Sequence, residues 1–529
     1  MATSDRLQSG QLTLPATDAL TRSRSRAIFG LTVAAFTLVA LALGTKLNLY
    51  IDELYSLHTT DHGFGYALQQ AIGFEQQPPL FFLALTAWRM LLPSDFFARL
   101  FPICCSIATL FVVRAFGRRR LSVLPDWSAP LAVTLNPFFL WTALDVRVYA
   151  PIVLVSSILV TAFFEAFADE DLSLSKLAGF TLAAIAALYT QYFIGSLFVG
   201  FALTLLLAGP RRKIVPFVVS MAVVALACLP LLGILRHEFH DATVVDAVTP
   251  LTVGGHMVSA LAAFVYPHYW IGVVSKFLIL PYVTLTLFSL VFVLREIRFS
   301  STLQRLVTIA ACSIAFFTLV IVVARAPLEM PRHIATLFVP IVLLGLAGIA
   351  AKLGDIERRR ALAAYVALLA VFSAADDAVA FRPPISNTGD WQRVGDFLNA
   401  RVRASEPIAV FDTEAVLAVQ HYYRGSSRIV ALPHAQDFTV FDRRDFAIRN
   451  PAELAAAFPA PSPVTRRVWL VFGTSGCTIV EFNASCSILN SYLERHFNVV
   501  QEGKFNGTVV RELQVKRESS ITTHTARKG

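Results

Sequence analysis

The chain has 529 residues, of which 56% are hydrophobic and only 15% are charged, and its mean hydropathy is +0.61. A soluble domain carries about 25% charged residues, so this composition excludes a single globular core, a disordered chain and a disulfide-dense module. Several apolar stretches of about 20 residues predict membrane spans instead. The formal charge of +9 is expected to mark cytoplasmic loops, as basic residues do in membrane proteins, and we expect no nucleic-acid partner.

The first span is predicted directly after a basic segment. Residues 1–26 are polar and end in three arginines, and an apolar run follows from 27 to 45. This run is longer than the core of a signal peptide and lacks an obvious cleavage site of small residues, so we expect an uncleaved span. The positive-inside rule then places residues 1–26 in the cytoplasm and the first loop, 48–96, outside.

Two apolar segments follow, and only the second is predicted to cross the membrane. Segment 78–93 has about 16 residues, which is marginal against the roughly 20 that a span needs. Segment 97–116 is long enough and is followed by Arg118, Arg119 and Arg120. If both segments crossed, these arginines would lie outside, against the positive-inside rule. We therefore expect 78–93 to form a juxtamembrane or re-entrant helix and 97–116 to be the second span.

The remaining spans continue in the same alternating order. Nine more are predicted near 128–144, 148–167, 177–191, 193–209, 214–235, 271–294, 303–324, 333–351 and 361–380. Basic residues such as Arg211, Arg295 and Arg358 then fall on the cytoplasmic side. The prediction is a polytopic α-helical membrane protein with about eleven spans over residues 27–380 and an outside C-terminus.

The composition changes after residue 380. Short apolar strands are expected at 408–411, 428–432 and 468–472, separated by helical stretches at 390–403, 413–423, 451–458 and 486–496. Residues 381–529 are therefore predicted to form one soluble α/β domain, which is periplasmic if the Ala- and Arg-rich sequence is bacterial. An exported domain permits a disulfide between Cys477 and Cys486, and the sequence leaves open whether it forms.

Ionisable side chains are almost absent from the predicted span centres but collect at the outward-facing ends. Charges near a hydrocarbon core are costly and often functional. The set comprises Asp52, Glu53, Glu75, Asp145, Arg147, Arg325, Glu329, Arg332 and His333. The carboxylate pair at 52 and 53 is compatible with a solvated loop or the first turn of a helix, or with a base that takes a proton from an attacking hydroxyl.

Each arginine of this set is compatible with a structural role and with a functional role. Arg147 either snorkels or pairs with Asp145, or it binds a phosphate through its two-pronged guanidinium. Arg332 and His333 either belong to a plain outer-loop cluster or begin a span whose N-terminus helps to bind an anion. The other outer histidines lack metal-ligand spacing, so we expect no metal and no cofactor.

Five motifs occur together in one order along residues 27–345. They are Asp52-Glu53, Pro78-Pro79-Leu80, Pro137 with Asp145-x-Arg147-x-Tyr149, Tyr189-Thr190-Gln191-Tyr192-Phe193, and Arg332-His333 with Pro340. In this order the sequence resembles the GT-C glycosyltransferases of the protein-mannosyltransferase and aminoarabinose-transferase superfamily. The nearest branch is that of the bacterial lipopolysaccharide galacturonosyltransferases, in glycosyltransferase families 39 and 83.

The resemblance implies a GT-C fold, a polyprenyl-phosphate-linked sugar donor and an acidic base in the first outer loop. Asp52 becomes the base with Glu53 beside it, and Arg147, Arg332 and His333 become ligands of the donor phosphate. The residues expected to position substrate are Tyr55, Glu75, Asp145, Tyr149, Gln191 and Tyr192. The chain departs from the family at Asp145, Gln191 and His333, where the family commonly has Glu, His and Tyr.

The expected function is inverting transfer of a sugar to a cell-envelope acceptor at the periplasmic face of the bacterial inner membrane. Lipid A, the lipopolysaccharide core, another glycan or a protein are all compatible acceptors. One alternative is a lipid-linked-sugar transporter or flippase, which predicts polar groups and broken helices near the midplane and two repeated halves. Another is a membrane-anchored binding protein that uses the α/β tail, a function that leaves the outer charges unexplained.

Overall fold

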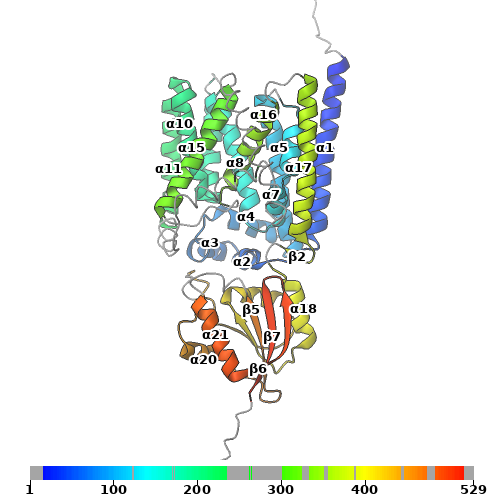
Figure 1. The fold of residues 1–529 in the computed structure, drawn as a ribbon. Coiled ribbons are helices and arrows are strands. Elements are labelled where there is room, and N and C mark those ends of the chain that lie inside the picture. The colour runs from blue at the N-terminus through cyan, green and yellow to red at the C-terminus, as the bar shows by residue number, and fades with distance from the viewer. Residues whose placement is uncertain are drawn as a thin grey trace, which may run out of the picture.

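The computed structural model describes residues 16–121, 124–168, 171, 173–234, 261, 264, 301–324, 333–350, 355–386, 389–441, 446–473 and 483–516. These residues form a helix bundle with a sheet-containing C-terminal region (residues 381–516) at one end (Figure 1). The predicted span 271–294 and the predicted site residue Arg332 lie outside the described residues.

The bundle consists mainly of long apolar helices. Their bounds are α1 (Ala16–Gly44), α5 (Asp95–Arg120), α8 (Tyr149–Phe163), α9 (Leu174–Thr190), α10 (Gly195–Ala208), α11 (Ile214–Ala227), α15 (Ser301–Ala324), α16 (Phe338–Ala350) and α17 (Asp355–Ala380). Five described segments are long and apolar enough to span a membrane, namely Ser23–Gly44, Asp95–Arg120, Tyr149–Ala168, Thr302–Val323 and Ile356–Ala380. The total of eleven spans stays a prediction.

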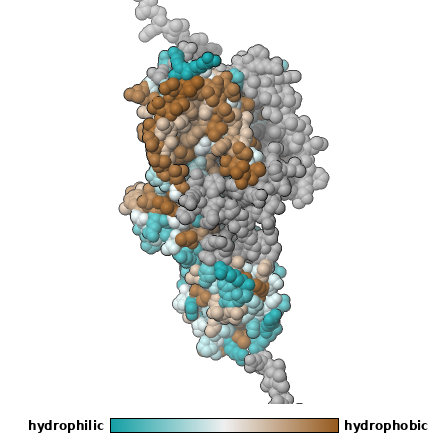
Figure 2. Space-filling view, turned by 90° about the vertical axis from the view of Figure 1, so that its left-hand side faces the viewer, coloured by the Kyte–Doolittle hydropathy of each residue, from teal (hydrophilic) through white to brown (hydrophobic). Residues whose placement is uncertain are grey.

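The outer surface of the bundle is suited to lipid. Figure 2 shows apolar side chains covering the side on which α10, α11 and α15 lie, and Leu206, Val218 and Leu319 are among the exposed ones. Hydrophilic side chains are frequent on the C-terminal region in the same view. This contrast is that of a multi-pass membrane protein with one water-exposed region.

Short helices and turns interrupt the bundle. The single span predicted at 128–144 is instead two helices, α6 (Ser128–Thr134) and α7 (Pro137–Leu144). Pro137 has no backbone N–H and its ring would clash within a continuous helix, while the Asn136 side chain accepts the Phe138 N–H at 3.0 Å and caps the second helix. The remaining short elements are η1 (Phe164–Ala168), η2 (Tyr192–Ile194), η3 (Arg211–Lys213), η4 (Leu229–Leu231) and η6 (Ala335–Leu337).

Three short helices of segment 48–96, predicted as the first outer loop, lie between the bundle and the C-terminal region (Figure 1). They are α2 (Ile51–Thr59), α3 (Phe64–Gly73) and α4 (Leu80–Arg89). At about 1.5 Å per residue, a helix of the length of α4 is far too short to cross a bilayer, as we predicted for segment 78–93. Arg89 ties α4 to the end of α2, because it donates to the Leu57 carbonyl at 2.6 Å and to Thr60 Oγ1 at 2.7 Å.

The C-terminal region contains a five-stranded sheet in the order β4-β3-β5-β7-β6. The strands are β3 (Ile408–Phe411), β4 (Ile429–Ala431), β5 (Arg467–Gly473), β6 (Phe497–Phe505) and β7 (Thr508–Val515), preceded by a hairpin of β1 (Phe381–Arg382) and β2 (Ile385–Ser386). β3 pairs in parallel with β4 and β5, whereas β7 pairs antiparallel with β5 and β6. The three strands predicted from apolar runs are thus confirmed, and they form the parallel part of the sheet.

Helices cover both faces of this sheet. One face is covered by α18 (Trp391–Arg401) and α19 (Val416–Tyr422), and η7 (Thr413–Ala415) directly precedes α19. The other face is covered by α20 (Pro451–Ala457) and α21 (Asn483–His496). Ile408 and Val410 belong to the first core, while the alternating residues Ala409 and Phe411 belong to the second. Such a strand is buried on both faces, which explains its continuous apolar sequence. Cys486 is disulfide-bonded, and Cys477 lies outside the described residues.

The C-terminal region packs directly on the first outer loop. The Asn48 N–H donates to the Pro384 carbonyl at 2.7 Å, and the Leu49 N–H donates to Tyr422 Oη at 2.6 Å. Further along the loop, the His58 ring stacks on Phe438 with 4.0 Å between ring centroids. The segment that leads into α2 is therefore held from the C-terminal side as well as by the bundle.

Candidate active site

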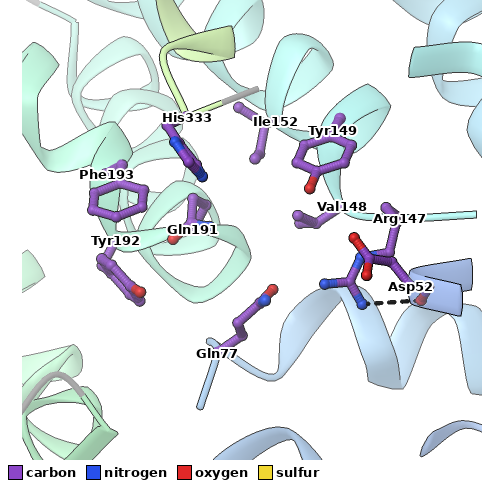
Figure 3. Close-up of a pocket in the computed structure, with 10 residues that line it drawn as sticks. All are labelled: Asp52, Gln77, Arg147, Val148, Tyr149, Ile152, Gln191, Tyr192, Phe193 and His333. Carbon is purple, nitrogen blue, oxygen red and sulfur yellow. Dashed lines mark hydrogen bonds between the residues drawn. The ribbon is translucent and has the colours of Figure 1, made fainter. Parts of the chain in front are cut away.

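A cavity of about 150 Å³ lies where the first outer loop meets the bundle. Figure 3 shows its two facing walls, with Gln77 reaching in from below. One wall comes from the break between α9 and α10 and from His333, which precedes η6. The other wall comes from α2 and from the start of α8 with the two residues before it. The lining residues are Asp52, Gln77, Arg147, Val148, Tyr149, Ile152, Gln191, Tyr192, Phe193 and His333.

Asp52 belongs to the first turn of α2, where the partial positive charge of a helix N-terminus favours a carboxylate. Its Oδ2 lies 3.4 Å from Tyr50 Oη, and the same phenol oxygen lies 3.1 Å from Asp145 Oδ2. Asp52 is the carboxylate among the residues that line the cavity. The phenol of Tyr50 lies between it and Asp145, a second carboxylate that does not line the cavity.

Glu53 is the next residue, yet it does not line the cavity, because consecutive residues of a helix point in directions about 100° apart. It is fully buried, its Oε2 accepts the Tyr50 N–H at 3.1 Å, and its Oε1 accepts the Val146 N–H at 3.1 Å. Arg99 Nη2 lies 3.3 Å from Oε2, which completes a buried ion pair with α5. Burial raises the pKa of Glu53, and Arg99 together with the two backbone N–H groups counters that rise.

These contacts give Glu53 a structural role. Its carboxylate joins the start of α2 to α5 and to the turn before α8, and it does not line the cavity. The expectation that Glu53 shares the catalytic role with Asp52 is therefore not supported by its position, because its oxygens are already occupied by buried donors.

Arg147 lines the cavity and is fixed by three acceptors. Its Nη1 donates to Glu75 Oε2 at 3.2 Å, to Ser56 Oγ at 3.1 Å and to the Asp52 backbone carbonyl at 3.3 Å, the bond drawn in Figure 3. Thr59 Oγ1 donates to the other Glu75 oxygen at 3.0 Å. Glu75 thus holds the Arg147 guanidinium in place, although Glu75 itself does not line the cavity.

The structure brings most of the sequence-predicted residues to one place but divides them into two groups. Those that line the cavity are Asp52, Arg147, Tyr149, Gln191, Tyr192 and His333. Those that lie behind the lining are Glu53, Tyr55, Glu75 and Asp145, of which Tyr55 packs against Phe74 at 5.4 Å between ring centroids. Arg332 is outside the described residues, so its role stays a prediction.

Sequence reasoning missed two residues of this network, Arg99 and Tyr50. Arg99 lies near the outer end of the predicted span 97–116, and a charge at such a position was a signal for a buried partner. Gln77, directly before the Pro78-Pro79-Leu80 motif, lines the cavity as well and was not among the predicted residues. Tyr50 carried no signal, because its role depends on the position of Asp145.

The arrangement combines a carboxylate, a guanidinium, two amides, two phenols and an imidazole in one small cavity. A fixed guanidinium can bind a phosphate, and a carboxylate beside it can accept a proton. Among the described residues, no group of three or more His, Cys, Asp or Glu side chains is placed to hold a metal ion. The described site therefore offers general-base and anion-binding chemistry.

No family model and no curated protein matches the sequence. Among the solved structures that share its fold are two of ArnT from Cupriavidus metallidurans. The form bound to undecaprenyl phosphate is 13% identical with a TM-score of 0.55, and the match covers 94% of this chain and 98% of that one. The apo form is 14% identical with a TM-score of 0.52, and the match covers 91% and 97%. ArnT is a GT-C glycosyltransferase, so the chain has the GT-C fold.

Proposed function

We propose that the chain is an inverting glycosyltransferase that uses a polyprenyl-phosphate sugar donor. The acceptor is a cell-envelope molecule, such as lipid A, the lipopolysaccharide core or another glycan, at the periplasmic face of the bacterial inner membrane. The observation that carries the proposal is the meeting of Asp52 and Arg147 in one cavity at the end of the bundle. The shared fold with a protein bound to undecaprenyl phosphate supports this donor class.

The location suits a lipid-linked donor. A polyprenyl tail stays in the bilayer, so its phosphate and sugar must be held where the bundle meets the outer loop. In the proposed reaction Arg147 binds the phosphate and stabilises the negative charge that grows on it as the bond to the anomeric carbon breaks. His333, on the facing wall, and Arg332 are the further proposed phosphate ligands.

Asp52 supplies the base in this scheme. The acceptor hydroxyl attacks the anomeric carbon from the side opposite the phosphate, a new carbon–oxygen bond forms as the phosphate leaves, and Asp52 takes the hydroxyl proton. A single displacement inverts the anomeric carbon. Gln77, Gln191, Tyr149 and Tyr192 are positioned to hydrogen-bond the sugar hydroxyls, and whether the sugar is a hexose or a pentose is to be decided by experiment.

The test uses purified protein with labelled undecaprenyl-phosphate-linked hexoses and pentoses and with lipid A and core acceptors. Asp52→Asn should lower transfer by at least about 100-fold, the usual contribution of a general base. The matched control Asp396→Asn removes an exposed carboxylate from α18 and should leave transfer unchanged. Undiminished transfer by Asp52→Asn would remove Asp52 as the base.

Binding and transport are measured beside transfer. Undecaprenyl phosphate alone should bind the Asp52→Asn protein as it binds wild type, whereas Arg147→Gln should weaken binding. A transporter or flippase is the second candidate, because the break at Asn136 is the type of helix interruption that such proteins use. Movement of the labelled lipid across a vesicle membrane without transfer to any acceptor would favour that function over ours.

A further inference from the structure

Tyr50 Oη lies between two carboxylates, 3.1 Å from Asp145 Oδ2 and 3.4 Å from Asp52 Oδ2. A phenol has a single proton, so it can donate to only one of them at a time. The other contact is favourable only when that carboxyl group carries a proton and donates to the phenol oxygen. One extra proton shared among the three side chains would make both contacts favourable.

The surroundings decide which carboxyl group holds that proton. Asp145 is only 3% exposed, and its Oδ1 has no hydrogen-bond partner among the described residues, whereas Asp52 faces the cavity. Burial, and then the negative charge of Glu53, raise the pKa of Asp145 well above its ordinary value, and Arg147 opposes that rise. An ionised carboxylate that is buried without sufficient donors is costly, so Asp145 is the group that stays neutral.

The other charged groups near Asp145 do not change the conclusion that Asp145 is the neutral carboxyl group. From the α2 side, Tyr50, Asp52 and Glu53 face Asp145, and from the start of α8, Arg147 and Tyr149 do. Glu53 is compensated by its own partners on α5 and in the turn, as described above. Burial raises the pKa of Tyr50 well above its ordinary value, and the charge of Asp52 raises it further, so the phenol keeps its proton and can donate it.

We propose that Asp145 is a neutral carboxylic acid that donates to Tyr50 Oη, and that Tyr50 in turn donates to Asp52 Oδ2. This chain rests on the proposed function of Asp52 as the base. A hydrogen bond to the charged form of a carboxyl group favours that form, and a neutral Asp145 removes a repelling charge from behind the base. Tyr50 and Asp145 are positioning residues, and their protons stay in place while Asp52 gains the acceptor proton and later releases it to water.

The kinetic test compares three variants. Tyr50→Phe should lower kcat by roughly 10-fold or more, the usual effect of losing a hydrogen bond to a charged group, and should leave the KM for the donor nearly unchanged. It should also move the acidic limb of the kcat profile to higher pH, because the base loses a donor that favours its ionised form. Asp145→Asn keeps a neutral donor and should retain most of the activity, whereas Asp145→Leu should behave like Tyr50→Phe.

Two kinetic outcomes would overturn the proposal. If Asp145→Asn is as damaging as Asp145→Leu, the native carboxyl group is ionised and the order of donors is wrong. If Tyr50→Phe has the pH profile of wild type, Tyr50 does not act on the base. Either result can occur while Asp52→Asn is inactive, so the failure of this inference is distinguishable from the failure of the proposed function.

A spectroscopic test needs no substrate. Infrared difference spectra of wild type at neutral pH against Asp145→Asn should show the carbonyl stretch of one protonated carboxyl group. The band should change frequency in Tyr50→Phe, because the hydrogen bond to the phenol is lost, and should be unaffected in Asp396→Asn. If the wild type minus Asp145→Asn spectrum shows an ionised carboxylate instead, the assignment of Asp145 is overturned, whatever the activity of the variants.

Discussion

Both ends of the helix bundle carry ion pairs between arginine and a carboxylate, but the two sets differ in burial. At the end that faces the C-terminal region, the side chains of Arg99 and Glu53 are 3% and 1% exposed. At the opposite end, those of Arg119 and Glu165 are 63% and 35% exposed. The residue types are the same, and the environment decides what each pair does.

The difference in burial divides the ion pairs into those that fix the positions of side chains and those that do not. A buried pair needs good geometry and further hydrogen bonds to offset its desolvation, so it fixes the elements that supply its partners. An exposed pair is screened by water and salt and fixes little. We infer that the basic residues at the far end serve mainly to orient the protein in the membrane, whereas the buried pairs at the near end hold Asp52 and Arg147 in place.

The largest effect is expected for Arg99→Leu. This change leaves the Glu53 carboxylate buried without its cation, which should destabilise the fold by about 3–5 kcal/mol. Thermal unfolding in detergent should show a clear loss of stability, and the double variant Arg99→Leu/Glu53→Leu should recover much of it. A single variant that is no less stable than the double variant would contradict the view that the pair is a coupled unit.

A smaller effect is expected at Asp412, a buried carboxyl group that follows β3 and has no arginine. Burial raises its pKa from 3.8 to about 6, although backbone N–H groups of the following turn counter the rise. A carboxyl group with a raised pKa contributes stability that is fully present below about pH 4 and is lost as the pH rises through about 6. Asp412→Asn should therefore match wild type below about pH 4 and exceed it by about 3 kcal/mol at neutral pH. Equal pH dependence of unfolding in both proteins would contradict this.

The smallest effect is expected at the exposed pairs. Arg119→Gln should change the stability by no more than about 1 kcal/mol, because the pair is open to solvent. Arg118→Gln, which breaks a similar exposed pair with Asp126, is the matched comparison. A loss of stability as large as that of Arg99→Leu, measured by the same thermal unfolding, would remove the distinction between the two ends of the bundle.

The sequence predicted the elements that local pattern determines. The apolar runs at 408–411 and 468–472 are strands, since a strand buried on both faces has few polar residues. The hairpin of β6 and β7 was missed because most β6 side chains are exposed and the apolar pattern is weak. Its turn, Asn506-Gly507 with Gly507 at φ +73°, was a readable hairpin signal.

The site could be predicted only in part. The motifs located the outer loop and the turn before α8, but they named Asp52 as the base and placed Glu53 beside it in the catalytic group. What separates them is long-range, because Glu53 is bonded to residues 46 and 93 positions away, Arg99 and Val146. Neither partner follows from a local pattern, so only the folded chain shows which carboxylate faces the cavity.

The bond from the Leu49 N–H to Tyr422 Oη joins residues that are 373 positions apart, only three residues before Asp52. The loop that carries Asp52 is therefore positioned partly by the C-terminal region. A chimera that grafts the sheet of another protein with the GT-C fold onto residues 16–380 should need a phenol at the position of Tyr422. Recombination between such proteins is constrained to carry both partners together.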